Sequence, residues 1–322
     1  MRLLNARTKK LEQFFGDNIP EYAILSHTWG PEELTYGEYM ASGCLPSNFK
    51  IDGCCSIALG QQLEYVWIDT ICIDKSSSAE LSEAINSMYE WYRKAMVCFA
   101  YLSDVSCNAS TPIADIASSD SDFSRSRWFT RGWTLQELIA PRAVSFFNNQ
   151  WELIGHKQQA VSHPSYRARR ARRADEVSIL TILRRITNIP LVVLDCQTPP
   201  ASISVATRMT WAAKRQTTRR EDMAYCLLGL FNINMTMLYG EGDRAFRRLQ
   251  EEIIRTSDDE SIFVWGFGCT TADALTRGNK LYIEADTLLA SSPADFERDG
   301  RRVRHIAIPN PRILANCERE AQ

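Results

Sequence analysis

The chain has 322 residues, of which 45% are hydrophobic and 24% charged, a composition typical of a globular protein with one large domain or two ordinary ones. Its formal net charge of -2 argues against non-specific electrostatic binding to nucleic acid or anionic lipid, because such binding usually requires an excess of clustered Lys and Arg. We therefore expect no nucleic-acid partner.

The cysteines and histidines do not suggest a metal site. The chain has ten cysteines but no Cys-x-x-Cys pair, and only four histidines are available to complete a zinc site. Cys72 and Cys98 lie inside apolar runs, a usage typical of reduced cysteine in the cytosol. The N-terminus lacks the apolar core of a signal peptide, and no apolar run reaches about 18 residues. We therefore expect a cytoplasmic protein with no metal and no membrane span.

Three apolar runs in the first third of the chain predict strands. They are Tyr22–Ser26, Tyr65–Ile73 and Met96–Leu102. Between the second and third, apolar residues recur every three or four positions from Ala79 to Lys94, and the preceding serines can cap the resulting helix. A strand, a helix and a strand in succession form a βαβ unit with parallel strands. This part of the chain is therefore predicted to be an α/β domain.

Polar residues directly follow the first two predicted strands. Ser26, His27 and Trp29 lie at the end of the first, and the second ends in the segment from Asp69 to Asp74. In parallel sheets, ligands bind beyond the carboxyl ends of the strands. We therefore predict that both segments face one cleft.

The middle of the chain is expected to complete this domain. Residues 107–126 predict a surface loop, residues 128–139 a helix that ends before Pro141, and residues 143–151 a strand. Five arginines within residues 163–175 show no apolar periodicity, which is typical of a solvated linker.

The last part of the chain is predicted to be mainly helical. We expect helices at 179–186, 205–214, 221–231 and 243–255, and a strand at 261–268. We therefore divide the chain into an α/β domain (1–160), an Arg-rich linker or insertion (161–176), a smaller helical domain (177–297) and an irregular tail (298–322).

Three blocks of sequence identify a family. In chain order, the segments 22–30, 67–75 and 131–137 resemble the three blocks of the fungal heterokaryon incompatibility (HET) domain. Residues 211–229 and 238–242 resemble the helical region that follows this domain in proteins of the HET-E and HET-D kind. The resemblance covers most of residues 1–297. Asp74 and Lys75 stand where many HET domains have Asn-Gln, so a role of that amide pair cannot be carried over.

The resemblance implies a function in fungal self/non-self recognition, where an activated HET domain triggers growth arrest or cell death. Its partners would be copies of itself or an upstream NLR-like sensor. HET domains are distantly related to TIR domains, and residues 133–138 resemble the Trp-Cys-x-x-Glu-Leu box of that family. The implied fold is a TIR-like, flavodoxin-like parallel sheet with flanking helices. In TIR enzymes that cleave NAD, the glutamate of this region is catalytic, and Glu137 takes its position.

Cleavage of the nicotinamide–ribose bond requires a carboxylate beside the positive charge that develops on the ribose. The resemblance implies that Glu137 supplies it, with NAD or a related nucleotide as substrate and no bound cofactor. Trp29 or Trp133 would stack on a ring, and Arg131 would pair with the pyrophosphate. Ser26, His27, Asp69 and Asp74 would form the walls of the site.

Each of these residues also has a structural interpretation. Glu137 can instead form an ion pair with Arg131 or Arg142, and a tryptophan such as Trp133 is more often a core residue. Ser26 lacks the Gly-x-Ser-x-Gly context of a hydrolase nucleophile. The competing hypothesis for the whole chain is a non-enzymatic signalling module in the same pathway. The enzyme hypothesis requires Glu137 to reach a pocket bordered by residues 26–29 and 69–74.

Overall fold

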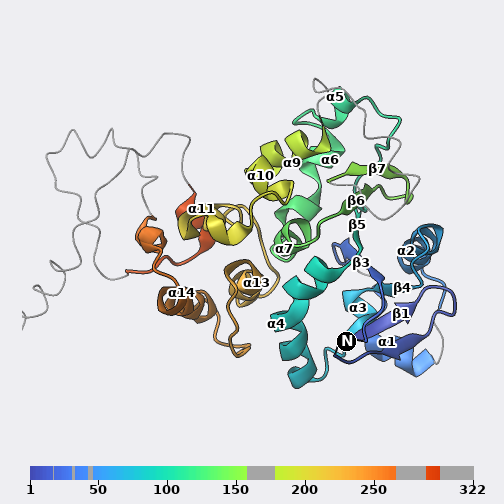
Figure 1. Ribbon diagram of the computed structural model, residues 1–322, viewed down its shortest axis with the longest axis horizontal. Coiled ribbons are helices and arrows are strands. Elements are labelled where there is room, and N and C mark those ends of the chain that lie inside the picture. The colour runs from blue at the N-terminus through green and yellow to red at the C-terminus, as the bar shows by residue number, and fades with distance from the viewer. Residues whose placement is uncertain (17, 31–32, 43–45, 158–177, 266–287, 298–322) are drawn as a thin grey trace, which may run out of the picture.

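The computed structural model describes residues 1–16, 18–30, 33–42, 46–157, 178–265 and 288–297. At its centre lies a seven-stranded sheet in the order β2-β1-β4-β3-β5-β6-β7 (Figure 1). The strands are β1 (Arg2–Asn5), β2 (Leu11–Gln13), β3 (Tyr22–His27), β4 (Tyr65–Trp67), β5 (Val97–Tyr101), β6 (Val144–Phe147) and β7 (Leu153–His156). Strands β4, β3, β5 and β6 are parallel to one another, whereas β1, β2 and β7 pair antiparallel at the two edges.

The parallel strands confirm the α/β class, but the sheet is mixed rather than wholly parallel. Counted along the chain, the parallel strands run 2-1-3-4, which is the beginning of the flavodoxin-like order. Every residue of β3, β5 and β6 is buried, as expected where helices cover both faces of a parallel sheet. The edge strands have only three or four residues, which is too short for a periodic signal in the sequence.

The helices of the first half connect and cover these strands. They are α1 (Tyr36–Ser42), α2 (Phe49–Gly60), α3 (Asp69–Cys72), α4 (Ser78–Lys94), α5 (Ile113–Ile116), α6 (Asp122–Arg125), the 3-10 helix η1 (Arg127–Thr130) and α7 (Thr134–Ile139). The prediction for α4 is confirmed, because the Ser77 side chain caps it by accepting from the backbone N–H of Glu80. The predicted loop at 107–126 contains the short helices α5 and α6.

Three predicted elements of the first half are wrong in extent. The strand expected at 143–151 is the shorter β6, because a turn begins at Asn148. The second strand ends at Trp67, and α3 follows because the N–H of Cys72 turns back to bond the carbonyl of Ile68. The helix expected at 128–139 is divided into η1 and α7. Between them, the N–H of Gly132 donates to the carbonyl of Gln216 over 2.9 Å, a bond that an uninterrupted helix would not leave available.

The second half of the described chain is helical, as predicted. Its elements are α9 (Ile179–Thr187), α10 (Leu191–Leu194), η2 (Pro200–Ser202), α11 (Val205–Thr210), α12 (Asp222–Tyr225), α13 (Leu228–Phe231), α14 (Arg244–Thr256), η3 (Glu260–Phe263) and η4 (Pro293–Phe296). The helix expected at 221–231 is two short helices. The strand expected at 261–268 is wrong where described, because Asp259 accepts from the N–H of Ser261 and starts a 3-10 turn. The Arg-rich stretch at 163–175 and the tail lie outside the described residues.

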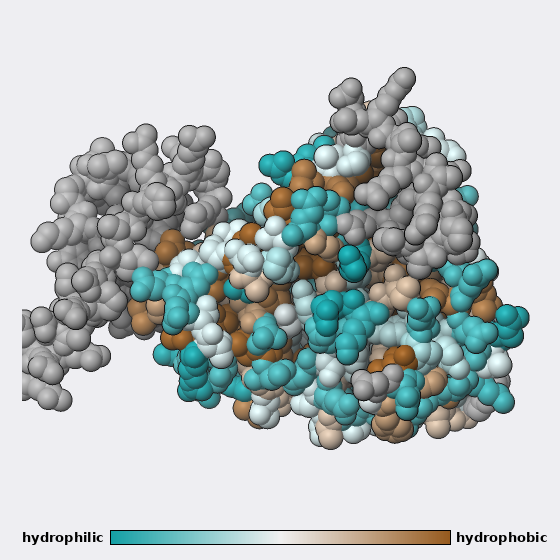
Figure 2. Space-filling view, in the orientation of Figure 1, coloured by the Kyte–Doolittle hydropathy of each residue, from teal (hydrophilic) through white to brown (hydrophobic). Residues whose placement is uncertain are grey.

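The helical half packs against α4 and α7 (Figure 1). Buried residues of both halves form one continuous hydrophobic cluster. At Gly229 in α13, an added Cβ would lie 2.0 Å from the Cβ of Tyr89 in α4, so only glycine permits this approach of the helices. Charged and polar side chains cover most of the face seen in Figure 2, interrupted by small apolar patches. Within the described residues, the structure has no helix of the length and apolarity that a membrane crossing requires. The domain boundaries stay a prediction.

Candidate functional site

Glu137 lies in α7 with its carboxyl group against the carboxyl end of β3. The residue is 7% exposed, and its carboxyl accepts a hydrogen bond from the hydroxyl of Ser26. The indole N–H of Trp128 donates to the same Ser26 oxygen over 2.8 Å. Tyr92, whose hydroxyl donates to the carbonyl of Leu25 over 2.9 Å, also contacts the carboxyl. These buried neighbours fix the carboxyl group and shield it from water.

Burial raises the pKa of Glu137 to about 8, because surroundings of low polarity disfavour the charged carboxylate. The negative charge of Asp69 acts in the same direction. The hydrogen bond from Ser26, the contact with Tyr92 and the positive charge of Arg215 act in the opposite direction. Glu137 is therefore largely protonated at neutral pH, and a cation placed beside it would favour its ionised form.

The ion pair considered for Glu137 with Arg131 or Arg142 is not formed in the described structure. The guanidinium of Arg131 donates instead to the hydroxyl of Thr218 over 3.0 Å, and Arg142 is exposed. The cation whose charge acts on Glu137 is Arg215, which sequence analysis did not identify. Arg215 comes from the helical half of the chain, so spacing along the sequence gave no signal for it.

Two buried cations hold the ends of α7. At its C-terminal end, the Lys157 ammonium donates to the carbonyls of Leu138 and Pro141 over 2.7 and 2.8 Å, where the helix dipole favours positive charge. Near its start, the Arg215 guanidinium donates to the hydroxyl of Thr134 over 2.9 Å. These bonds fix the helix and thereby the position of the Glu137 carboxyl.

The residues that follow β3 and β4 contact one another beside this helix. Asp69 accepts a hydrogen bond from the indole N–H of Trp29 over 3.0 Å and forms an ion pair with Lys75 at 3.2 Å. The Lys75 ammonium also lies 3.5 Å from the centre of the Trp29 ring, in a cation–π contact. His27 Nε2 lies 3.9 Å from the Asp69 carboxylate. The structure thus brings together the two strand ends that the sequence predicted to share a cleft.

Glu33 and Lys50 extend this cluster and were not identified from the sequence. Glu33 accepts a hydrogen bond from Lys50 in α2, and its carboxylate lies 3.5 Å from Nε2 of His27. Burial alone would raise the pKa of Glu33, but its interaction with His27 and the hydrogen bond from Lys50 lower it to about 2. Glu33 follows a Gly-Pro break by two residues and belongs to no periodic element, so the sequence contained no signal for it.

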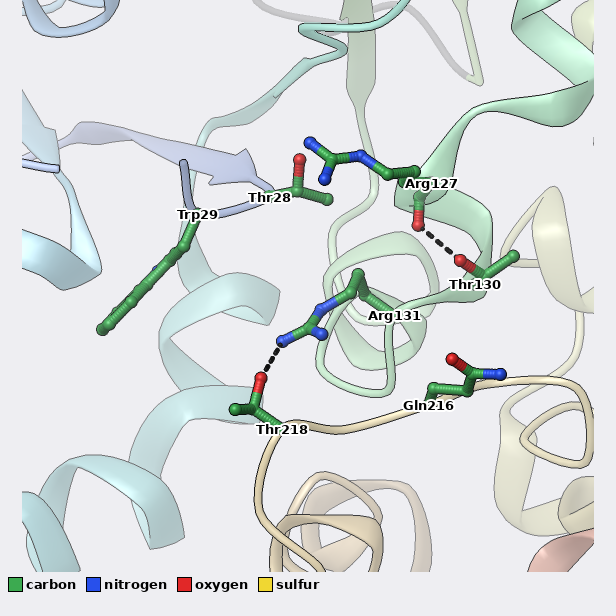
Figure 3. Close-up of a pocket in the computed structure, with 7 residues that line it drawn as sticks. All are labelled: Thr28, Trp29, Arg127, Thr130, Arg131, Gln216 and Thr218. Atoms are coloured by element: carbon green, nitrogen blue, oxygen red, sulfur yellow. Dashed lines mark hydrogen bonds between the residues drawn. The ribbon is translucent and has the colours of Figure 1, made fainter. Parts of the chain in front are cut away.

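A cavity of about 290 Å³ opens beside Trp29. Its lining residues come from three segments: Thr28 and Trp29 after β3, Arg127, Thr130 and Arg131 from η1 and its end, and Gln216 and Thr218 from the helical half. Figure 3 shows the Arg131 guanidinium at the centre of this group and the Arg127 guanidinium beside Thr28. Glu137 is not among the lining residues, although its helix α7 begins three residues after Arg131.

Of the eight predicted site residues, Trp29 and Arg131 line the cavity, and Asp74 and Trp133 lie apart both from it and from the contacts around Glu137 and Asp69 described above. Asp74 accepts hydrogen bonds from the backbone N–H and the hydroxyl of Ser76, over 3.0 and 2.6 Å, and these bonds shape the turn before α4. Trp133 is half-buried against the hydrophobic core and interacts with the Asp222 carboxyl, which favours its structural interpretation. Among the described residues, no group of three His, Cys, Asp or Glu is arranged to hold a metal ion.

The fold and these blocks define a class of protein. Residues 22–121 match the family model described as heterokaryon incompatibility protein (HET). The matched segment contains β3 to α5 and ends before Glu137. Residues 244–320 match a model described as a domain of unknown function, DUF8212. The chain belongs to the HET-domain family, and the family resemblance found in the sequence is confirmed.

One relative extends the match beyond these models. The chain is 43% identical over 247 residues to vegetative incompatibility protein HET-E-1 of Podospora anserina. This region is 73% of the present chain but only 16% of that relative. No solved structure matched the chain.

Proposed function

We propose that this HET-domain protein is an effector of fungal vegetative incompatibility that triggers cell death by cleaving NAD or a related nucleotide. The observation that carries the proposal is the buried Glu137 carboxyl, bonded to Ser26 at the end of the central parallel strand β3. Ligands of flavodoxin-like sheets bind beyond this strand end. The 43% identity to a vegetative incompatibility protein supports the biological role. We also propose that the α/β domain is TIR-like.

In the proposed reaction, the bond between nicotinamide and the ribose breaks, and nicotinamide leaves as a neutral molecule with the bonding electrons. Water adds to the ribose carbon and releases a proton, which yields ADP-ribose. Because nicotinamide bound to ribose is cationic, its arrival beside Glu137 favours the carboxylate form. That carboxylate then stabilises the positive charge that develops on the ribose.

The proposed site is closed in the single chain. Glu137 is 7% exposed and does not line the cavity beside Trp29. A substrate therefore reaches its carboxyl only after residues that line this cavity move. We propose that assembly with further copies of the chain, or with an upstream NLR-like sensor, produces this movement and thereby activates the protein in the cytoplasm.

The burial of Glu137 also favours a second candidate function, a signalling module without enzymatic activity. In that case the Ser26–Glu137 bond stabilises the fold, and the surface around Trp29, which is 49% exposed, binds a protein partner. The two candidates differ in whether toxicity depends on loss of NAD.

Expression of the full chain in a fungal or yeast host, with NAD and free nicotinamide measured over time, tests the proposal. The enzyme hypothesis predicts nicotinamide release and cell death with the native chain, and neither with Glu137→Gln, which preserves the size of the side chain. A matched control is Glu83→Gln, which removes a carboxylate from α4 outside the site. Cell death that continues in Glu137→Gln with unchanged NAD would support the signalling module instead.

A further inference from the structure

The cavity beside Trp29 has an unusual balance of charge for a chain with net negative charge. Its lining contains two arginines, Arg127 and Arg131, and no carboxylate among the described residues. The other polar groups that line it are threonine hydroxyls and one amide, contributed by Thr28, Thr130, Gln216 and Thr218. Such a lining offers many hydrogen-bond donors and a positive potential, which suits an anion with several oxygen atoms.

Both guanidinium groups keep donors available for a ligand. Arg131 uses one terminal nitrogen to donate to Thr218 over 3.0 Å, and the remaining donors of its planar fork are unassigned within the described structure. Arg127 lies 3.8 Å from the Asp104 carboxylate through Nε, and its side chain is 64% exposed. Figure 3 shows both side chains entering the same space.

The helical half of the chain builds one wall of this cavity. The N–H of Gln216 donates to the carbonyl of Thr130 over 2.7 Å, which fixes this segment against the end of η1. The neighbouring Thr218 accepts from Arg131 and so orients its guanidinium. The cavity is therefore incomplete without residues 216–218, which lie far beyond the residues that match the HET family model.

We propose that this composite cavity binds the diphosphate of a nucleotide, with Arg127 and Arg131 as its ligands and the Gln216–Thr218 segment as a required wall. This assignment rests on the proposed cleavage of an NAD-like nucleotide. In it, the residues of the cavity recognise the phosphates of that substrate. A volume of about 290 Å³ is at the lower limit of ligand pockets, so the cavity accepts part of a dinucleotide rather than all of it. Trp29, held by Asp69 and Lys75, is placed at its border to stack on an adjoining ring.

Binding of ADP-ribose and of inorganic pyrophosphate to the full chain, measured by calorimetry at low and high salt, tests this assignment without requiring catalysis. Arg131→Ala is expected to weaken both by roughly tenfold or more, because a hydrogen bond to a charged group is lost. The double variant Gln216→Ala, Thr218→Val, which leaves the backbone bonds of this segment in place, is expected to weaken both by several-fold. The control is Arg255→Ala, which removes an exposed arginine at the end of α14 and should bind as the native chain does.

The outcomes separate this assignment from the proposed reaction. Arginine-dependent pyrophosphate binding by a chain that releases no nicotinamide even after its assembly is induced would support the cavity and refute the reaction. Nicotinamide release that is equal in the native chain and Arg131→Ala would refute the cavity and leave the reaction standing. Equal affinities of Arg131→Ala and Arg255→Ala, or no binding of either probe to the native chain at low salt, would also overturn the assignment.

Discussion

Replacement of Glu137 by Gln should change how stability depends on pH. The folded protein holds the pKa of this carboxyl at about 8, above its ordinary value of 4.5, so the folded state binds the proton more tightly than the unfolded chain. This contribution to stability is complete below the unfolded pKa and is lost as pH rises through the folded pKa. From pH 5 to pH 8, the two pKa values correspond to a loss of roughly 3–4 kcal/mol from this one group.

Glutamine has nearly the same shape as a protonated glutamate, and its amide oxygen can still accept from Ser26, but it does not titrate. Urea denaturation of both proteins at pH 5, 6.5 and 8, under reducing conditions, measures the effect. The free energy of unfolding of the native chain should fall relative to that of Glu137→Gln by roughly 3–4 kcal/mol over this range. Titrating groups that do not interact with Glu137 occur in both proteins and cancel in the difference. A difference that does not change with pH would refute the buried, protonated carboxyl.

Three further substitutions test the framework around the site. Lys157→Met leaves the carbonyls at the end of α7 without their buried donor, and should lower the free energy of unfolding by about 2–4 kcal/mol in urea denaturation. An unchanged midpoint would show that Lys157 does not stabilise the end of α7. Gly229→Ala places a Cβ against the side chain of Tyr89 and should lower the free energy of unfolding by about 1–3 kcal/mol, measured by thermal unfolding. Unchanged stability would contradict the close approach of α4 and α13. Ser77→Ala removes the cap of α4 and should cost about 1 kcal/mol, with the exposed Ser78→Ala as the neighbouring control.

The sequence predicted the parts of the fold whose signals are local. Strand β3 and helix α4 follow from a continuous apolar run, a three- and four-residue periodicity and a serine cap, and each of these acts within a few residues. The predicted meeting of the strand ends at Trp29 and Asp69 follows from parallel pairing. The edge strands β2 and β7, by contrast, pair with the neighbouring strands β1 and β6, but their three or four residues are too few to show an alternating pattern.

The candidate site could be predicted only in part, because it joins distant segments of the chain. The position of Glu137 beside Ser26 joins residues 111 positions apart, and the bonds from Arg215 to the start of α7 join segments from the two halves of the chain. The break at Gly132 depends on pairing with Gln216, so the periodicity of residues 128–139 indicated one helix where the structure has two. Burial and pKa shifts arise from this packing and become visible only in the folded protein.

The most direct test of the central claim is nicotinamide release from NAD by the full chain after its assembly is induced, for example by fusion to a dimerising domain. The account predicts release by the native chain and release reduced to the level of the buffer control by Glu137→Gln, with both proteins folded. Equal release by the native and Glu137→Gln chains, or none from an assembled native chain whose expression still kills the cell, would contradict it.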